Sequence, residues 1–245
     1  MRIAELWRYP VKSLQGECVD RLAFGPGGAV GDRGWAFVSK ETGALLTAKT
    51  VPQMLAGRAR LVDGIPEIDH PGESVTRWLG RDVRLDAAAA DTAVSFEMTF
   101  DPPNDDAELY EIPAPPASFM DLAAVHVMTT ASLARCREAR PDLQWDRRRF
   151  RPTILIDCDA DGFPEQAWVG RRIRLGSLVL DVDMETVRCA MPLRAQPALG
   201  QNPPIERSTD IYRALDEVHD NHLGVYCSVA EPGSASVGDA VTVLD

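Results

Sequence analysis

Short segments in which apolar and polar residues alternate recur along this chain roughly every ten residues, and glycine or proline separates each segment from the next. The first three are Ile3–Tyr9, Val19–Phe24 and Trp35–Ser39, and Pro10 and Gly25 end the first two. Alternation with a period of two indicates strands with one buried face. The spacing is typical of a barrel or sandwich rather than of repeated βαβ units. We therefore expect a mainly β protein.

The rest of the chain predicts further strands and a few helices. A threonine cap at Thr129 or Thr130 begins a helix that runs through Ala139, and 205–218 is also expected to be helical. Strands are expected at 44–47, 55–62, 83–85, 125–128, 150–157, 224–229 and 240–244, with a hairpin over 172–182 that turns at Gly176–Ser177. The predicted fold class is mainly β with several helices, an α+β fold.

Residues 101–118 carry five prolines and few apolar residues. Such a composition is typical of a linker or surface loop, and it is the best place in the sequence for a domain boundary. With 245 residues, 45% of them hydrophobic, the chain can form two small cores. We expect one β-barrel-like domain over 1–115 and a second, barrel-forming domain over 116–245.

The charge balance excludes broad classes of partner. A formal net charge of −11 opposes general binding to nucleic acid or to anionic membranes, which depends on clustered Lys and Arg. No stretch reaches the roughly 18 apolar residues of a membrane span, and no signal-type apolar region follows Met1. We expect a cytoplasmic protein with neither a nucleic acid nor a membrane as partner.

The cysteine pattern matches neither a disulfide framework nor a zinc or iron–sulfur module, because the number is odd and no CxxC pair occurs. The five are Cys18, Cys136, Cys158, Cys189 and Cys227. Cys136 and Cys158 are expected in the core. Cys189 follows a strand pattern beside Arg188, which would favour the thiolate that acts as nucleophile or metal ligand. The same position also suits a small buried residue, and its local context alone leaves both interpretations open.

Two other constellations have competing interpretations. Arg147–Arg149 and Arg151 precede an apolar strand, where Arg149 and Arg151 would point the same way on an extended chain and could clamp an oxyanion. A solvated charged face is the alternative that the residues alone favour. His219 and His222 could chelate a metal from one helix face, but no third ligand is indicated, and a surface turn is favoured.

A set of short motifs, in a fixed order, resembles the MOSC superfamily, named after the C-terminal domain of molybdenum-cofactor sulfurase, together with its N-terminal β-barrel partner. The motifs are Tyr9–Ser13, Gly31–Trp35, Leu46–Lys49, Thr129–Leu133, Arg149–Pro152, Arg188–Cys189 and Val237–Asp239. Within that superfamily the pattern is most similar to the amidoxime-reducing proteins, which reduce N-hydroxylated compounds.

The resemblance implies a molybdenum–molybdopterin cofactor. In the family, a cysteine at the position of Cys189 coordinates the metal, so Cys189 is the expected catalytic and metal-binding residue, and a soft sulfur ligand suits such a centre. The pterin phosphate is bound in the family at the positions of Lys12, Ser13, Arg33 and Arg151. The expected cofactor-binding set also includes Arg149, Thr153 and Tyr226.

The sequence departs from the amidoxime-reducing pattern at two places. Thr153 replaces a usual Asn, and Pro192–Leu193 replaces a Thr-Thr pair. The chain also lacks the ferredoxin-like extension of some relatives, so a separate electron donor of ferredoxin, flavodoxin or cytochrome b5 type, with its reductase, is expected. The alternatives are a non-catalytic cofactor carrier or sulfur-transfer module, and a family member that has lost cofactor binding.

Overall fold

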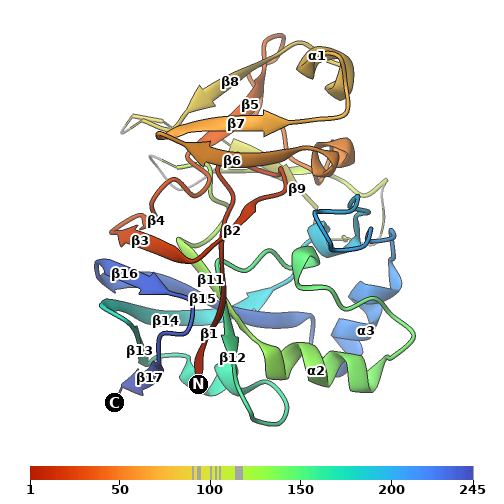
Figure 1. Ribbon diagram of the computed structural model, residues 1–245. Coiled ribbons are helices and arrows are strands. Elements are labelled where there is room, and N and C mark those ends of the chain that lie inside the picture. Colours follow the sequence, from red (N-terminus) through yellow and green to blue (C-terminus); the bar gives the residue numbers. More distant parts are fainter. Residues whose placement is uncertain are drawn as a thin grey trace.

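The computed structural model describes residues 1–89, 91–92, 95–99, 101–102, 104, 106–113 and 118–244 (Figure 1). Its helices are α1 (Val75–Leu79), α2 (Thr130–Ala139) and α3 (Asp210–His219), with short 3₁₀ helices η1 (Pro52–Ala56), η2 (Arg147–Arg149), η3 (Pro164–Trp168) and η4 (Met191–Leu193). The strands are β1 (Arg2–Arg8), β2 (Glu17–Val19), β3 (Arg21–Gly25), β4 (Gly28–Ala29), β5 (Trp35–Ser39), β6 (Arg58–Val62), β7 (Ile65–Asp69), β8 (Val83–Ala87), β9 (Ser95–Met98), β10 (Tyr110–Pro113), β11 (Val125–Thr129), β12 (Ile154–Asp157), β13 (Arg172–Leu175), β14 (Leu178–Val187), β15 (His222–Glu231), β16 (Gly233–Ser236) and β17 (Val241–Leu244). The expected mainly β, α+β class is confirmed. Within the described residues, no helix is both long and apolar enough to cross a bilayer.

One large sheet organises the lower half of the molecule in Figure 1. Its strand order is β17-β13-β14-β15-β11-β12-β1-β2. The two ends of this sheet approach each other, because Arg2 bridges Ala240 and the Ile3 amide donates to the Asp239 carbonyl over 2.9 Å. The sheet therefore curls around an apolar core, although no continuous ladder closes it into a barrel among the described strands.

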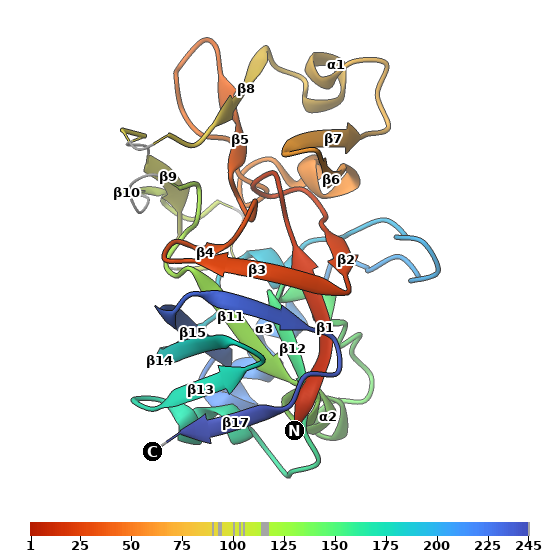
Figure 2. The same cartoon turned by 60° about the vertical axis from the view of Figure 1, so that its left-hand side comes forward.

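Smaller sheets form the upper part of the molecule. β5 pairs with β8, β6 with β7, and β9 with β10, while β3 joins β16 and β4 in a sheet between the two parts (Figures 1 and 2). Because β1 pairs with β12, the first strand of the chain lies in the sheet of the C-terminal half. The division at residue 115 remains a prediction.

Elements specified by local signals lie where the sequence places them. The Thr129 side chain accepts a hydrogen bond from the Ser132 amide over 3.1 Å, which caps α2 as expected. The hairpin of β13 and β14 turns at Gly176 and Ser177. β11 and β12 are neighbouring parallel strands, and α2 links them. The expected barrel or sandwich topology did not include such a βαβ arrangement.

Several expected bounds are wrong because longer-range contacts determine them. Residues 205–209 are not helical, since Ile205 pairs its backbone with Gln196, and α3 begins only at Asp210. The expected strand at 55–62 begins at Arg58, because Pro52 opens a 3₁₀ helix. The strand expected at 150–157 begins at Ile154, and that at 44–47 is reduced to a single bridge at Leu45.

The proline-rich segment is only partly a loop. Tyr110–Pro113 forms β10 and pairs with β9, which the low apolar content of the segment did not predict. The prolines at 103, 115 and 116 lie outside the described residues.

Gly224 in β15 offers a test of how tightly β11 and β15 pack. Its φ is +82°, and a Cβ would lie 2.5 Å from His126 Nε2 and 2.6 Å from the Val127 carbonyl oxygen. We expect Gly224→Ala to lower the free energy of unfolding by about 3 kcal/mol through a left-handed residue and overpacking. Urea denaturation measures this loss in the free energy of unfolding.

Gly170→Ala is the control, because its φ is +80° but no atom lies within 4 Å of a Cβ there. It should cost about 1 kcal/mol, and equal losses would contradict the packing explanation.

Candidate active site

A cavity lies where loops of the N-terminal part meet the start of β11, the segment after β14 and the middle of β15. It brings together seven of the eight expected site residues: Lys12, Ser13, Arg33, Arg151, Thr153, Cys189 and Tyr226. Arg149 does not line it. Ser13 and Cys189 therefore line the same cavity, although they are more than 170 positions apart in the sequence.

Three residues of the cavity hold unusual backbone conformations. The φ angles of Ser13, Arg33 and Arg151 are 69°, 45° and 55°, in the left-handed region that disfavours residues with side chains. Strain of this kind persists where the surrounding structure enforces it, and it concentrates at ligand-binding sites. Here it aims two guanidinium groups at the same space.

Those two guanidinium groups stack on one aromatic ring. Arg33 and Arg151 lie 4.5 Å and 4.2 Å from the centroid of Tyr9. Burial raises the pKa of Tyr9 to about 12, against the opposing effect of both arginines, so its hydroxyl stays protonated and donates to the Pro152 carbonyl over 3.2 Å. Burial, and then the charge of Arg33, lower the pKa of Arg151 to about 10.

A carboxylate in the same cavity holds two lysines. Asp121 forms ion pairs with Lys12 and, at 2.9 Å, with Lys49. Burial alone would raise the pKa of Asp121, but the two ammonium groups lower it well below its ordinary value. Burial would lower the pKa of Lys49, but Asp121 and then Cys189 raise it, so this lysine is cationic beside the thiol.

Asp121→Asn should lower the free energy of unfolding at pH 7 by about 3 kcal/mol, because it leaves two buried ammonium groups without a counter-charge. The carboxylate is 33% exposed, which keeps the loss at the lower end for a buried pair.

The loss should also depend on pH. Because the folded pKa of Asp121 is lowered, its contribution to stability is full above about pH 4 and fades as the pH falls through the folded pKa. Denaturation at pH 7 and at pH 3 should show a smaller difference between parent and variant at pH 3. Asp82→Asn, which breaks an exposed pair with Lys40, is the control and should cost less than about 1 kcal/mol. A pH-independent difference would contradict this account.

Cys189 lies two residues after the end of β14 and is half-buried, with a free thiol. The preceding residue, Arg188, is held by reciprocal bonds with Asn221: the Arg188 amide donates to the Asn221 carbonyl over 3.0 Å, and Asn221 Nδ2 donates back over 2.9 Å. The Arg188 side chain lies 3.3 Å from His126 Nε2. Burial, and then Arg188, lower the pKa of His126 well below its ordinary value, so the imidazole is neutral.

The cavity contains buried polar atoms that await a ligand. Arg151 Nη2, Thr47 Oγ1 and Thr153 Oγ1 are inaccessible to solvent and have no hydrogen-bond partner among the described residues. An unsatisfied buried donor costs about 1–3 kcal/mol, so such groups are normally paired. Together with the surrounding cations, they suit an anionic, oxygen-rich ligand beside a thiol.

A second, more apolar recess adjoins the thiol. Phe96, Leu122, Val187 and Tyr212 line it, and it shares Lys49, Arg188 and Cys189 with the cationic cavity. The thiol therefore lies between a region suited to an anion and a region suited to an apolar group.

The basic cluster is neither an extended clamp nor a solvated face. Residues 147–149 form η2, so the expected extended geometry is wrong, and Arg148 and Arg149 are buried. Of the four arginines, Arg151 reaches the cavity. His219 and His222 flank a left-handed turn at Asp220–Asn221, so the expected turn is present, but Asn221 in it is buried.

Four further residues that line the cavity were not among the expected site residues: Lys49, Asp121, His126 and Arg188. Lys49 and Arg188 were named only within motifs or as a neighbour of Cys189, and Asp121 and His126 were not singled out. Lys49 carried a signal, because the chain has only three lysines and two of them lie here. Nothing local distinguishes Asp121, whose partners are 72 and 109 residues away.

Comparisons with known proteins found sequence matches along most of the chain. The family model described as the MOSC domain matches residues 115–242, and that of the MOSC N-terminal beta barrel domain matches residues 1–107. Mitochondrial amidoxime reducing component 2 of Bos taurus is 25% identical, over 98% of this chain and 82% of the relative. Mitochondrial amidoxime-reducing component 1 of Homo sapiens is also 25% identical, over 99% and 82%. The crystal structure of the YuaD protein from Bacillus subtilis is 14% identical, with a TM-score of 0.46 over 99% of this chain and 94% of that one.

Proposed function

Because the chain belongs to the MOSC domain family, we propose that its cavity binds a mononuclear molybdenum–molybdopterin cofactor and that the protein reduces N-hydroxylated compounds. The observation that carries the proposal is that one cationic cavity is lined by a residue with a free thiol and by residues whose buried polar atoms have no partner among the described residues. Two of the relatives have names that describe amidoxime reduction.

The residues present fit the cofactor. A thiolate is a suitable soft ligand for the metal, which assigns Cys189 as its protein ligand. Lys12, Ser13, Arg33, Arg151 and Thr153 would hold the pterin phosphate, and the unpartnered Arg151 Nη2 and Thr153 Oγ1 would gain acceptors there. Tyr226 lines both the cationic cavity and the apolar recess and would separate cofactor from substrate.

When bound, the cofactor would supply the two-electron chemistry that removes the N–OH oxygen as water. The chain's own groups do the rest. The apolar recess holds the carbon skeleton of the substrate, with Phe96 and Tyr212 in its wall. Lys49 stays protonated beside Cys189, so its Nζ places a positive charge next to the sulfur and can donate a hydrogen bond to the departing oxygen.

The electrons would come from a separate protein of ferredoxin, flavodoxin or cytochrome b5 type, with its reductase. The net charge of −11 favours docking to a basic face of that donor, because complementary charge speeds encounter. Small N-hydroxylated molecules are the proposed substrates.

Expression in a host that makes the cofactor tests the proposal. We expect about one molybdenum and one pterin per chain, and formation of amidine from a benzamidoxime-type compound with reduced viologen dye as artificial donor. Well-folded protein from that host without metal and pterin would overturn cofactor binding. Loaded protein that transfers cofactor to an apo-molybdoenzyme but forms no amidine would overturn the reductase and identify the carrier.

A further inference from the structure

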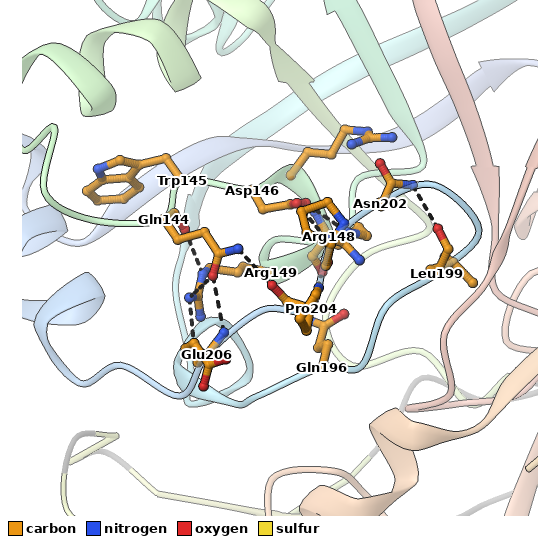
Figure 3. A network of polar contacts seen from close by, with 12 residues as sticks. Gln144, Trp145, Asp146, Arg148, Arg149, Gln196, Leu199, Asn202, Pro204 and Glu206 are labelled. Carbon is orange, nitrogen blue, oxygen red and sulfur yellow. Dashed lines mark hydrogen bonds and ion pairs between the residues drawn. The ribbon is translucent and has the colours of Figure 1, made fainter. Parts of the chain in front are cut away.

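Arg149 is a buried cation whose hydrogen bonds go to carbonyl oxygens of three separate segments. It is 1% exposed. Its Nε donates to the Gln144 carbonyl, its Nη1 to the Pro192 carbonyl and its Nη2 to the Glu206 carbonyl, each over 2.8 Å. Figure 3 shows this guanidinium beside Gln144 and Glu206. The Gln144 side chain also accepts a hydrogen bond from the Glu206 amide over 3.1 Å, so these two segments are linked directly as well.

One of these carbonyls belongs to the turn that carries the thiol. Pro192 lies in η4, three residues after Cys189. On the other side of the thiol, Arg188 Nη2 donates to the Phe150 carbonyl over 2.8 Å. Two consecutive residues, Arg149 and Phe150, therefore hold the chain on both sides of Cys189.

The next residue, Arg151, lines the cavity, and its buried Nη2 has no partner among the described residues. The segment 149–151 thus connects the turn of the thiol to the anion-binding wall. A displacement of this segment would move both groups together.

Arginine suits this role because its planar fork can bind several carbonyls at once, whereas a lysine ammonium offers one compact charge. Burial lowers the pKa of Arg149 to about 10, which shows that the position is costly for a cation. Three charge-assisted hydrogen bonds offset that cost, and they all restrain loops rather than an added ligand.

We propose that Arg149 is a positioning residue for the Cys189 thiol, which it fixes through the Pro192 carbonyl, and that it does not bind the cofactor. The inference rests on the proposed function only for what the thiol binds. The position of the thiol is a property of the chain without cofactor, so it can be measured there.

Arg148 provides a matched control from the same turn. It is also buried, but it pairs with Asp146 over 2.7 Å and donates to the Pro203 carbonyl over 2.6 Å, in the outer part of the loop that follows η4. Replacing it removes a buried guanidinium without touching Pro192.

The test compares Arg149→Lys with Arg148→Lys in the cofactor-free chain. Cys189 alkylation by iodoacetamide is followed by peptide mass spectrometry, and hydrogen exchange is measured at the amides of Leu193 and Arg194, which donate within η4. Loss of charge-assisted bonds should make both processes at least about tenfold faster in Arg149→Lys. Arg148→Lys should leave them near parent values, and the β13–β14 hairpin should exchange unchanged in both.

Guanidinium rescue separates positioning from a general loss of stability. In Arg149→Ala, millimolar guanidinium should restore slow alkylation of Cys189, and it should do nothing in Arg148→Ala. If Arg149→Ala does not fold, the lysine variant decides. Parent-like thiol reactivity in Arg149→Lys, or an equal acceleration in every part of the chain, would overturn the proposal. Neither result depends on whether the protein is a reductase.

Discussion

Cys189→Ser should emerge from a cofactor-producing host with at least about tenfold less molybdenum per chain than the parent, because a hydroxyl replaces the soft thiolate ligand. The pterin should fall less than the metal, since the cations that would hold its phosphate are unchanged. Elemental mass spectrometry and the fluorescence of released pterin measure the two quantities separately. Reductase activity should fall with the metal.

Stability should not account for that loss. Cys189 is half-buried and packs at the edge of a core cluster, so the serine should change the free energy of unfolding by less than about 1 kcal/mol. Cys158→Ser is the matched control: its thiol is also half-buried, but it lies after β12, away from the cavity. That variant should keep parent levels of metal. A Cys189→Ser protein with full metal content would refute the thiol as ligand.

Local chemistry was readable from the sequence where the deciding contacts are close along the chain. The cap of α2 lies within three residues of Thr129, and the β13–β14 turn is two residues long, so both were predicted correctly. The burial of Arg149 was not predicted, because two of its carbonyl partners are distant along the chain: Pro192 and Glu206 lie 43 and 57 residues away. No periodicity in the cluster itself encodes those carbonyls.

The site shows the same division. Cys189 was a candidate because a cysteine beside an arginine after a strand pattern can be reactive, but its local context left a buried structural role open as well, and the family resemblance assigned it as the metal ligand. The sequence around Asp121 carries no comparable signal, since a lone aspartate after a proline-rich segment looks like a solvated residue. Its role depends on Lys12 and Lys49 arriving from elsewhere in the fold.

The second large effect is expected for Arg151, whose replacement should strongly reduce cofactor binding but change the stability of the cofactor-free chain little. Arg151→Gln should reduce pterin and molybdenum per chain together by about tenfold or more, because it removes a charge-assisted donor for the phosphate. In this it differs from Cys189→Ser, which should remove mainly the metal. The ratio of pterin to metal therefore distinguishes an anion-binding residue from a metal ligand.

The cofactor-free Arg151→Gln chain should nevertheless unfold within about 1 kcal/mol of the parent. The variant loses the contact with Tyr9, worth about 0.5–2 kcal/mol, but it also removes an unpartnered buried donor that costs a similar amount. Because burial lowers the pKa of Arg151 to about 10, the charged form destabilises the folded chain below that pH, and uncharged Gln escapes this penalty.

Arg147→Gln is the control for both measurements. Arg147 belongs to the same cluster, pairs with Glu5 and lies 5.2 Å from the Trp7 centroid, but it does not line the cavity. It should keep parent levels of pterin. If Arg151→Gln instead loses more than about 3 kcal/mol while its pterin content tracks the folded fraction, Arg151 is a structural residue. The strained conformation and unpartnered Nη2 of Arg151 would then need an explanation other than an anion. A large loss of cofactor with little change in stability is the result expected of a cation that binds the cofactor and contributes little to the stability of the cofactor-free fold.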